Sequence, residues 1–272
     1  MPKDSFLSSE EERLSKEFLD TGYLVRACER PDLLSELKTL LLEESNVWLK
    51  RERQNGMIQD LSDSHLAITQ SFLNDLRLHL FARLNARTDT RLNYFRLAKN
   101  LIECVVGNEL AMQNKVNLSI QQPGDQSSVL ELHSDVWSGD SPFQVVEWVP
   151  LTDSRSTNAM YLLRPDLSIE AYRRARNGEL KSMSEIHDAY RDKFELIEVD
   201  FGQVLVFDSN CLHGNQLNTT SSTRWSLNCR VASLLAPATT PERRLGAYYT
   251  PITVRPATRM GLRAMEALGL ID

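Results

Sequence analysis

Long apolar runs are absent from this sequence, and none approaches the roughly 18 consecutive apolar residues that a membrane-spanning helix requires. The first residues, MPKDSFLSSEEERLSKEF, carry an acidic cluster where an export signal would need an apolar stretch. Cysteine is scarce, and its four copies show neither a CxxC pair nor another zinc-binding spacing. We therefore expect a soluble, cytoplasmic protein with free thiols at Cys28, Cys104, Cys211 and Cys229.

An excess of basic residues is also missing, because 31 lysines and arginines are outnumbered by 37 aspartates and glutamates, which gives a net charge of −6. A nucleic-acid backbone calls for a basic face, so nucleic acid is not expected as the main partner. One basic stretch remains, since the segment from Arg243 to Arg263 carries five arginines and no acid. We interpret that stretch as a solvated face.

The apolar pattern divides the chain into a helical part and a stranded part. Leucines and aromatic residues repeat with helical spacing up to about residue 110, as in PDLLSELKTLLLEES. Residues 111–240 then contain six short segments rich in β-branched and aromatic residues, namely KVNLSIQQ, FQVVEWVPL, AMYLL, FELIEV, QVLVFD and RWSLNCRVASLL. A helical insert at about 168–194 interrupts these segments, and residues 241–272 form a C-terminal tail.

This order of elements predicts one α+β domain that spans residues 1–272. A chain of 272 residues is long enough to bury one large core. Strands that follow one another without intervening helices favour an antiparallel sandwich or barrel. We therefore expect the helices of residues 1–110 to cover one face of a β-core formed by residues 111–240.

A histidine and an aspartate in ELHSDVWSGD, residues 131–140, are the first candidates for chemistry. Residues two apart on an extended segment point to the same face, so His133 and Asp135 could supply two neighbouring metal ligands. His213, which follows the buried-strand sequence VLVFDSNCL, is the natural third ligand, because the other candidates lie in helical stretches. Two histidines and one carboxylate form the facial triad of non-haem Fe(II) oxygenases, although HxD by itself is a weak signal.

Polar and apolar side chains alternate in the strand TRWSLNCRV, which follows His213. If Arg224 and Ser226 face the inside of a barrel, the guanidinium needs an anion, and its planar fork matches a carboxylate. The alternative is an outward-facing strand with solvated arginines, because alternation does not say which face is inside.

These residues resemble the HxD…H…RxS pattern of the 2-oxoglutarate and Fe(II)-dependent dioxygenases, in particular the phytanoyl-CoA-dioxygenase-like group. The stretches VNLSIQQPGD, LHSDVWSGDSPF and VLVFDSNCLHGN are also similar to a small bacterial branch encoded among genes for surface carbohydrate synthesis. The resemblance covers about residues 113–235. It implies a small-molecule substrate, either a small polar metabolite or a carbohydrate or nucleotide-sugar intermediate of surface polysaccharide synthesis.

The fold implied by the resemblance is a double-stranded β-helix, or jelly roll (cupin-like), with supporting helices. The resemblance also implies that His133, Asp135 and His213 hold Fe(II), and that Arg224 and Ser226 bind the distal carboxylate of the cosubstrate 2-oxoglutarate. Such enzymes consume O2, and hydroxylation of a substrate C–H bond is their usual reaction. Halogenation is not expected, because the halogenating branch replaces the carboxylate ligand with a small residue. Desaturation, epimerisation and ring formation use the same ligands and stay open.

Other polar residues could complete the site. Asn117 and Gln121 share one face of KVNLSIQQ and could hydrogen-bond the cosubstrate, or could equally face solvent on an edge strand. Glu147 and Trp148 lie on opposite faces of FQVVEWVPL, and we assign Trp148 to the core. The insert and the tail are expected to set substrate choice, with candidate sugar- or phosphate-binding side chains at Tyr248, Tyr249 and Arg255.

Two other classes of function remain open. A jelly-roll protein could bind sugar or hold a metal without oxygenase turnover, but it would not need a carboxylate clamp such as Arg224 beside the metal. A metal-dependent hydrolase or isomerase would need a general base, for which Glu131 and Asp140 are the nearby carboxylates.

Overall fold

The first helices begin and end where the sequence supplies caps. The computed structural model describes residues 6–54, 56–237 and 239–270. Helix α1 (Ser9–Thr21) begins after Ser8, which forms a capping box with Glu11, and it ends at Gly22 with a φ of 82°. Helix α2 (Pro31–Arg51) begins at a proline, whose missing N–H costs nothing in the first turn.

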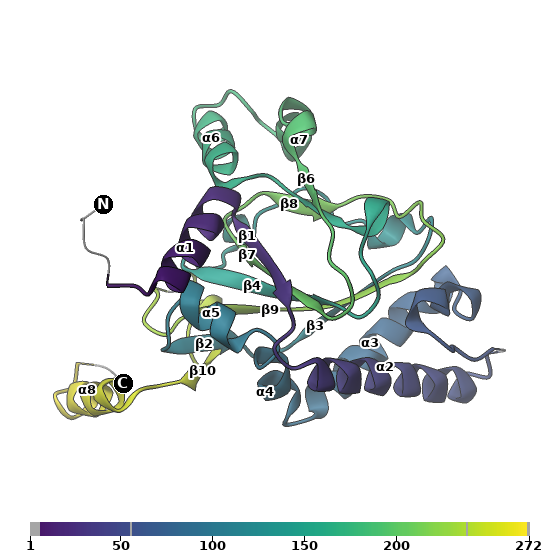
Figure 1. Ribbon diagram of the computed structural model, residues 1–272, viewed down its shortest axis with the longest axis horizontal. Coiled ribbons are helices and arrows are strands. Elements are labelled where there is room, and N and C mark those ends of the chain that lie inside the picture. The colour runs from purple at the N-terminus through teal and green to yellow at the C-terminus, as the bar shows by residue number, and fades with distance from the viewer. Residues whose placement is uncertain (1–5, 55, 238, 271–272) are drawn as a thin grey trace.

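The helical first part packs against one face of a sheet. After α2 it contains the 3-10 turn η1 (Leu61–Leu66) and the helices α3 (Gln70–Ala86), α4 (Thr90–Phe95) and α5 (Lys99–Val105). Helices α2 and α3 lie together at one end of the molecule, and α1 and α5 lie at the other (Figure 1). Their buried leucines join side chains of the sheet in one large apolar cluster, which places the main core between the helices and the sheet.

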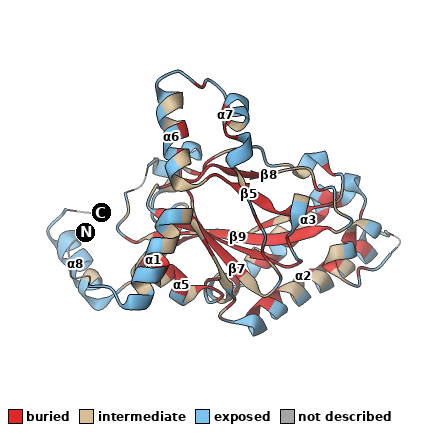
Figure 2. Ribbon diagram, turned by 45° about the horizontal axis from the view of Figure 1, so that its top comes forward, coloured by how far each residue is buried: buried red, intermediate tan, exposed pale blue. Residues whose placement is uncertain are grey.

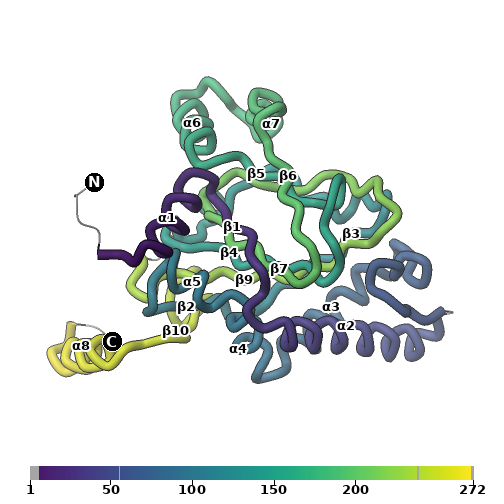
Figure 3. Tube along the Cα trace, in the orientation of Figure 1, coloured from purple at the N-terminus to yellow at the C-terminus, as the bar shows by residue number. Residues whose placement is uncertain are grey.

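Most strands form one antiparallel sheet in the order β1-β7-β4-β9-β2-β10, with β3 also pairing with β9. The N-terminal strand β1 runs beside β7 although the two are far apart in sequence (Figure 3). In chain order these strands are β1 (Tyr23–Ala27), β2 (Leu110–Gln113), β3 (Asn117–Gln121), β4 (Gln144–Pro150), β7 (Gln203–Asp208), β9 (Arg224–Ser233) and β10 (Tyr249–Thr253).

A second, smaller antiparallel sheet has the order β6-β5-β8. Its strands are β5 (Met160–Leu162), β6 (Glu195–Ile197) and β8 (His213–Asn215). Side chains of β5 and β6 pack against Val146, Trp148 and Phe207 of the main sheet, so the two sheets face one another across an apolar layer. This is the jelly-roll arrangement with supporting helices, and each of the six expected strand segments contains a strand. The α+β prediction is confirmed.

Alternation along β9 separates two environments. Trp225, Leu227 and Cys229 point into the large core beneath the helices, while Arg224 and Ser226 lie on the opposite face, between the two sheets. Buried residues are concentrated on these strands, and exposed residues on the outer faces of the helices (Figure 2). The polar face of β9 is therefore inside the protein, and the alternative of an outward-facing strand with solvated arginines is wrong.

The insert and the tail extend from this core. The insert consists of α6 (Pro165–Arg176), α7 (Met183–Ala189) and the turn η5 (Arg191–Lys193). In the tail, η6 (Pro241–Arg243) precedes β10, and α8 (Pro256–Ala267) follows it. The remaining 3-10 turns are η2 (Gln126–Ser128), η3 (Val136–Ser138) and η4 (Ser156–Asn158). Across the described residues, no helix has the length and apolar character needed to span a bilayer.

Candidate metal and cosubstrate site

Two histidines are brought together by a backbone bridge. The N–H of His133 donates to the carbonyl of His213 at 3.0 Å, and the N–H of His213 donates back at 2.9 Å. The ring centroids of the two imidazoles consequently lie 4.2 Å apart. The strand β8 thus positions His213 directly against the loop that carries His133.

The backbone also fixes the orientation of both imidazoles. Nδ1 of His133 lies 2.8 Å from the carbonyl oxygen of Glu131, and Nδ1 of His213 lies 2.8 Å from that of Cys211. Because a carbonyl only accepts, each Nδ1 carries a proton, and Nε2 is the ring nitrogen of each histidine that can bind a metal. Burial lowers the pKa of His213 to about 4, which keeps this imidazole neutral at physiological pH. Nε2 of His213 is therefore available to a metal ion, and Nε2 of His133 lies 3.9 Å from Oδ1 of Asp135.

Asp135 completes a group of three possible ligands. One ligand atom from each of His133, Asp135 and His213 lies within 4.8 Å of the others. The guanidinium of Arg230 on β9 donates two hydrogen bonds to this carboxylate, from Nη2 to Oδ1 at 2.6 Å and from Nε to Oδ2 at 2.9 Å. Burial alone would raise the pKa of Asp135, but the neighbouring His213 imidazole and Arg230 guanidinium hold it below its usual value. The carboxylate is therefore ionised and fixed in orientation.

Two residues of the C-terminal tail, Arg243 and Tyr249, contact Asp140, which in turn contacts Arg230. Asp140, only 1% exposed, lies 3.3 Å from Nε of Arg230 and 3.4 Å from Nη1 of Arg243. The Tyr249 hydroxyl lies 3.2 Å from Oδ1 of Asp140. Tyr249 is thus a buried bracing residue, and the expectation that it stacks on a sugar is wrong. Arg255 lies on a different surface, described below.

A second cationic group lines the same cavity and has no carboxylate partner among the residues that the structure describes. Arg224 is 3% exposed, and its Nη atoms donate only to the Asn158 carbonyl at 3.1 Å and to Oγ of Ser119 at 3.3 Å. Its Nε and the Oγ of Ser226 are buried and have no hydrogen-bond partner among the described residues. Burial lowers the pKa of Arg224 to about 10, so the guanidinium stays charged at neutral pH.

The candidate ligands and Arg224 line one cavity of about 270 Å³ between the sheets, whereas Ser226 is not among its lining residues. The three candidate ligands share it with Arg77, Arg224 and Arg230. Its apolar wall is formed by Val146, Trp148, Met160 and Phe207, so Trp148 belongs both to the core and to the cavity wall.

Asn117 and Gln121 do not line this cavity. The Asn117 amide donates to Oδ1 of Asn228 at 3.0 Å, and the Gln121 amide donates to the Gln216 carbonyl at 2.6 Å. Ser119, between them on β3, is the residue of that face that reaches the cavity. The structure therefore revises the expectation that the two amides contact the cosubstrate.

Sequence reasoning missed the roles of Arg230 and Arg77. Arg230 lies on the same face of β9 as Arg224, so the alternation could have indicated it, but its partner Asp135 is 95 residues away in the chain. Arg77 comes from helix α3, and nothing in its local sequence connects it with the cavity.

The residues present fit Fe(II) and 2-oxoglutarate. Two imidazole nitrogens and one carboxylate are the donor set that non-haem iron prefers, and they occupy one side of a cavity that leaves other positions free. The unsatisfied Nε of Arg224 and Oγ of Ser226 suit a dicarboxylate, because a buried guanidinium without an anion is costly.

Solved structures share this fold at low sequence identity. One is the non-haem monooxygenase ThoJ in complex with nickel, with 17% identity, a TM-score of 0.54 and coverage of 93% of this chain and 94% of that one. Another is HygX from Streptomyces hygroscopicus with nickel and 2-oxoglutarate bound, with 17% identity, a TM-score of 0.50 and coverage of 91% and 98%. A third is SnoK, a non-haem α-ketoglutarate-dependent carbocyclase from nogalamycin biosynthesis, with 14% identity, a TM-score of 0.51 and coverage of 92% and 95%.

At these identities the likeness establishes the fold alone. No curated protein matches the chain. A family model does match: that of phytanoyl-CoA dioxygenase (PhyH) covers residues 35–226, which is more than half of the sequence and includes all three candidate ligands. The chain belongs to the phytanoyl-CoA dioxygenase family.

Proposed function

We propose that this protein is a 2-oxoglutarate-dependent non-haem iron oxygenase, in which His133, Asp135 and His213 hold Fe(II). Arg224 and Ser226 bind the distal carboxylate of 2-oxoglutarate. The observation that carries the proposal is the buried, acid-free guanidinium of Arg224 in the same cavity as the three candidate ligands. Bound iron and 2-oxoglutarate supply the activation of O2 that leads to oxidation of a substrate C–H bond.

The chain's own residues orient the reactants. Arg224 and Ser226 anchor one end of the cosubstrate, which directs its other end toward the three ligands. Arg230 keeps the Asp135 carboxylate in one orientation, and the apolar wall around Trp148 and Phe207 limits access of water. Hydroxylation is the proposed outcome. The family chemistry also includes ring formation, as the description of SnoK illustrates.

The remaining cavity wall supports a polar, negatively charged substrate. Arg77 is half-buried, and its Nη2 donates to Oδ1 of Asn74 at 2.7 Å, with no carboxylate within 4 Å in the described part of the chain. Hydroxyl and amide side chains lie along the same cavity, at Ser127, Ser128, Asn215 and Asn228. Such a wall suits a sugar with an attached phosphate, and so favours a nucleotide sugar over a neutral metabolite.

The two other classes of function fit less well. A binding protein without turnover does not need the carboxylate-binding group that the buried charge of Arg224 provides. A hydrolase or isomerase would need a free carboxylate in the cavity, but neither Glu131 nor Asp140 lines it. Asp140 is instead held between Arg230 and Arg243.

Anaerobic visible absorption tests the cosubstrate complex. Addition of Fe(II) and then 2-oxoglutarate should produce a metal-to-ligand charge-transfer band. The band should be lost in His133→Ala, and Arg224→Ala should need at least ~10-fold more 2-oxoglutarate, as expected for a charged hydrogen bond. Arg155→Ala is the matched control, because that arginine is exposed and pairs with Asp200. A wild-type protein that binds iron but shows no band would refute the proposal.

Succinate formation tests the substrate class. Oxygenase turnover with UDP-glucose, compared with glucose, should release more succinate from 2-oxoglutarate, and the sugar product should gain one oxygen atom. Arg77→Gln should remove the preference for the nucleotide sugar, while the charge-transfer band stays intact. An unchanged preference in Arg77→Gln would exclude the anion-binding role of Arg77 and leave the oxygenase proposal standing.

A further inference from the structure

Helix α8 has an apolar face that no other described residue covers. It is 12 residues long, about 18 Å, and no residue in it is buried. Met260 is 72% exposed and Leu268 71%, and both lie with Ala257 and Ala264 on one side of the helix. A short helix with an apolar stripe in water is marginal by itself, because most helical stability comes from packing of that stripe.

The start of α8 is fixed, so that the helix leads away from the body of the molecule. Oε1 of Glu109 accepts the backbone N–H of Arg255 at 2.8 Å, and Oε2 accepts the hydroxyl of Thr258 at 2.8 Å. This carboxylate caps the first turn, which is also favourable for the helix dipole. In Figure 1 the helix stands apart from the sheets and from the other helices.

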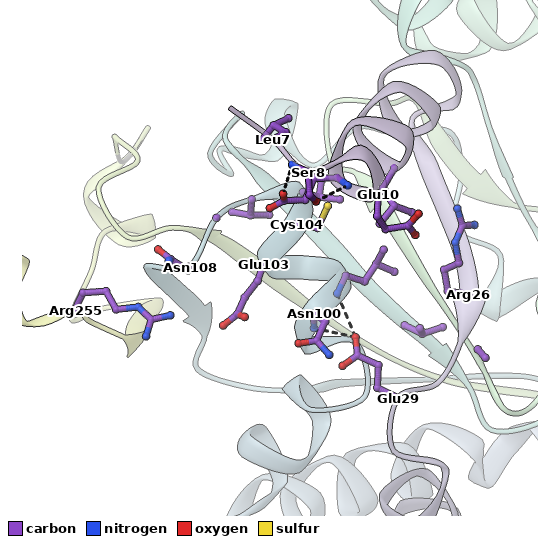
Figure 4. Close-up of a pocket in the computed structure, with 18 residues that line it drawn as sticks. Leu7, Ser8, Glu10, Arg26, Glu29, Asn100, Glu103, Cys104, Asn108 and Arg255 are labelled. Carbon is purple, nitrogen blue, oxygen red and sulfur yellow. Dashed lines mark hydrogen bonds between the residues drawn. The ribbon is translucent and has the colours of Figure 1, made fainter. Parts of the chain in front are cut away.

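A groove larger than the cavity at the candidate metal site lies beside the base of this helix. It has a volume of about 860 Å³ and runs between α1, β1 and α5, with Arg255 at one edge (Figure 4). Its apolar lining comes from Leu14, Leu101, Val105, Val106 and Val204. Its rim carries four carboxylates, from Glu10, Glu11, Glu29 and Glu103.

Charge on α8 complements this rim. Arg259 and Arg263 project from the side of α8 next to its apolar stripe, and neither has a carboxylate partner among the described residues. On the groove, Glu10 pairs with Arg13 in an exposed pair and Glu103 pairs with Lys99 in a partly buried one, and a second cation can join either pair. Glu11 and Glu29 cap the starts of α1 and α5.

We propose that α8 of one copy of this chain lies in the groove of a second copy, and that the exchange is reciprocal. The apolar stripe covers the groove lining, and the arginines face the acidic rim. Because each chain supplies both its α8 and its groove, the two equivalent contacts close a two-fold dimer. The chain's own groove is out of reach for its α8, because the Glu109 cap directs the helix away from it.

Mass in solution tests the dimer. Size-exclusion chromatography with light scattering at micromolar concentration should give the mass of two chains of 31.0 kDa each. Met260→Asp should weaken association by about tenfold or more, because it puts a charge into the contact. Val47→Asp is the matched control, since Val47 is equally apolar and 62% exposed but lies on α2. A monomeric wild type, or a Met260→Asp variant that dimerises unchanged, would overturn the proposal.

A charge exchange tests the pairing of helix and rim. Arg263→Glu and Glu103→Arg should each weaken the dimer several-fold, and the double variant should recover part of the loss. If the two losses simply add, the two residues do not meet and the proposed register is wrong.

Disulfide trapping distinguishes the possible occupants of the groove. Cys104 lines the groove and is only half-buried, while the other three cysteines are buried. With Ala264→Cys and an added oxidant, the proposal predicts a covalent dimer on a non-reducing gel that Cys104→Ser abolishes. A crosslink within one chain would show that α8 folds back into its own groove. A monomer that instead binds phosphatidylserine vesicles through α8 would identify a membrane surface as the partner. Either result overturns the dimer.

Discussion

Several ionisable side chains in this protein are buried or largely buried. Arg224, Arg230 and Asp135 line the cavity. Asp135 pairs with Arg230, and the unsatisfied Nε of Arg224 is open to a ligand. Glu147 of β4 is buried on the opposite face of the sheet, where neither carboxyl oxygen has a hydrogen-bond partner among the described residues. The first group suits catalysis, and the second has a cost in stability.

Replacement of Glu147 by an apolar residue should stabilise the protein. Burial, with a contribution from the charge of Glu29, raises the pKa of Glu147 well above its usual value, so the folded state holds a proton that the unfolded state releases. The free energy of unfolding should therefore fall as the pH rises from the unfolded pKa through the folded one. Glu147→Met should remove this slope and gain on the order of 1–3 kcal/mol near pH 8.

Urea unfolding at pH 6 and pH 8 checks this prediction. The difference between Glu147→Met and the wild type should be larger at pH 8. Glu198→Met, an exposed carboxylate on the surface, is the control and should show no comparable gain. Equal differences at the two pH values would mean that Glu147 is ionised in the folded state.

Loss of Arg230 should weaken the metal site without unfolding the protein. Its two hydrogen bonds orient Asp135, and removal of such a supporting partner typically costs ~10–100-fold in metal affinity. Anaerobic titration with Fe(II) should show this loss in Arg230→Gln, and a smaller loss in Arg230→Lys, which keeps the charge but only one direction of contact. Wild-type affinity in Arg230→Gln would mean that the backbone alone orients Asp135.

Short elements, rather than long ones, place the candidate ligands. β8 has only three residues, yet it pairs with β5 and carries His213, and its backbone lies against the segment before His133. Such close contact is possible because position 214 is a glycine. A methyl group there would lie 2.5 Å from the Tyr161 hydroxyl and 2.8 Å from the Leu130 carbonyl oxygen.

Gly214→Ala should therefore disturb both the strand and the site. The carbonyl of Leu130 accepts the N–H of Asn215 at 2.9 Å and cannot withdraw without breaking that bond. We expect a loss of about 1–3 kcal/mol in the free energy of unfolding and weaker Fe(II) binding, because His213 is the adjacent residue. Thermal unfolding and metal titration of the variant measure the two effects. Full stability with normal metal binding would show that the loop around Leu130 moves freely.

The molecule as a whole is held together across the cavity by residues from distant parts of the chain. Asp135 precedes β4, Arg230 lies on β9, and Arg243 and Tyr249 belong to the tail. A ligand that binds between these parts stabilises the folded state by mass action, since the unfolded chain has no such site.

Metal and 2-oxoglutarate should therefore raise the melting temperature in two separate steps. At about 100 times its dissociation constant each ligand contributes ~2.7 kcal/mol, which corresponds to several degrees for a chain of this size. Differential scanning fluorimetry with Ni(II), then with 2-oxoglutarate, measures both steps, and a chelator should reverse them. Arg224→Ala should keep the first step and lose the second, whereas loss of both would point to a misfolded variant.

Local periodicity explains what could be predicted from the sequence. The short spacing of His133 and Asp135 keeps them together, although the segment is a single bridge followed by the turn that begins η3 and not an extended strand. The two-residue period of strand β9 separates Arg224 and Ser226 from Trp225 and its apolar neighbours. Helical spacing of leucines located α2 and α3, and the turn-rich stretches located six of the strands. These features depend on backbone geometry over a few residues, so no knowledge of distant contacts was needed.

The sequence did not predict the strands and ion pairs whose partners lie far away in the chain. β2, β8 and β10 are short, and their hydrogen bonds go to strands far away in the chain, so their own sequences give little signal. The same is true of the ion pair between Asp135 and Arg230 and of the burial of Tyr249 against Asp140. Asn117 and Gln121 have the right spacing, but their amides bond to neighbouring loops and strands instead of the cavity.

The sequence by itself therefore determined the class of fold, the three candidate metal ligands and the strand that carries Arg224. Only the tertiary structure decided that the polar face of β9 is inside, that Arg230 supports Asp135, and that Arg77 reaches the cavity. It also decided that the tail braces the metal site while α8 stays uncovered. The physical reason is that side-chain periodicity is a local property of the backbone, whereas burial and ion pairing depend on which distant segments the packing of the sheets brings together.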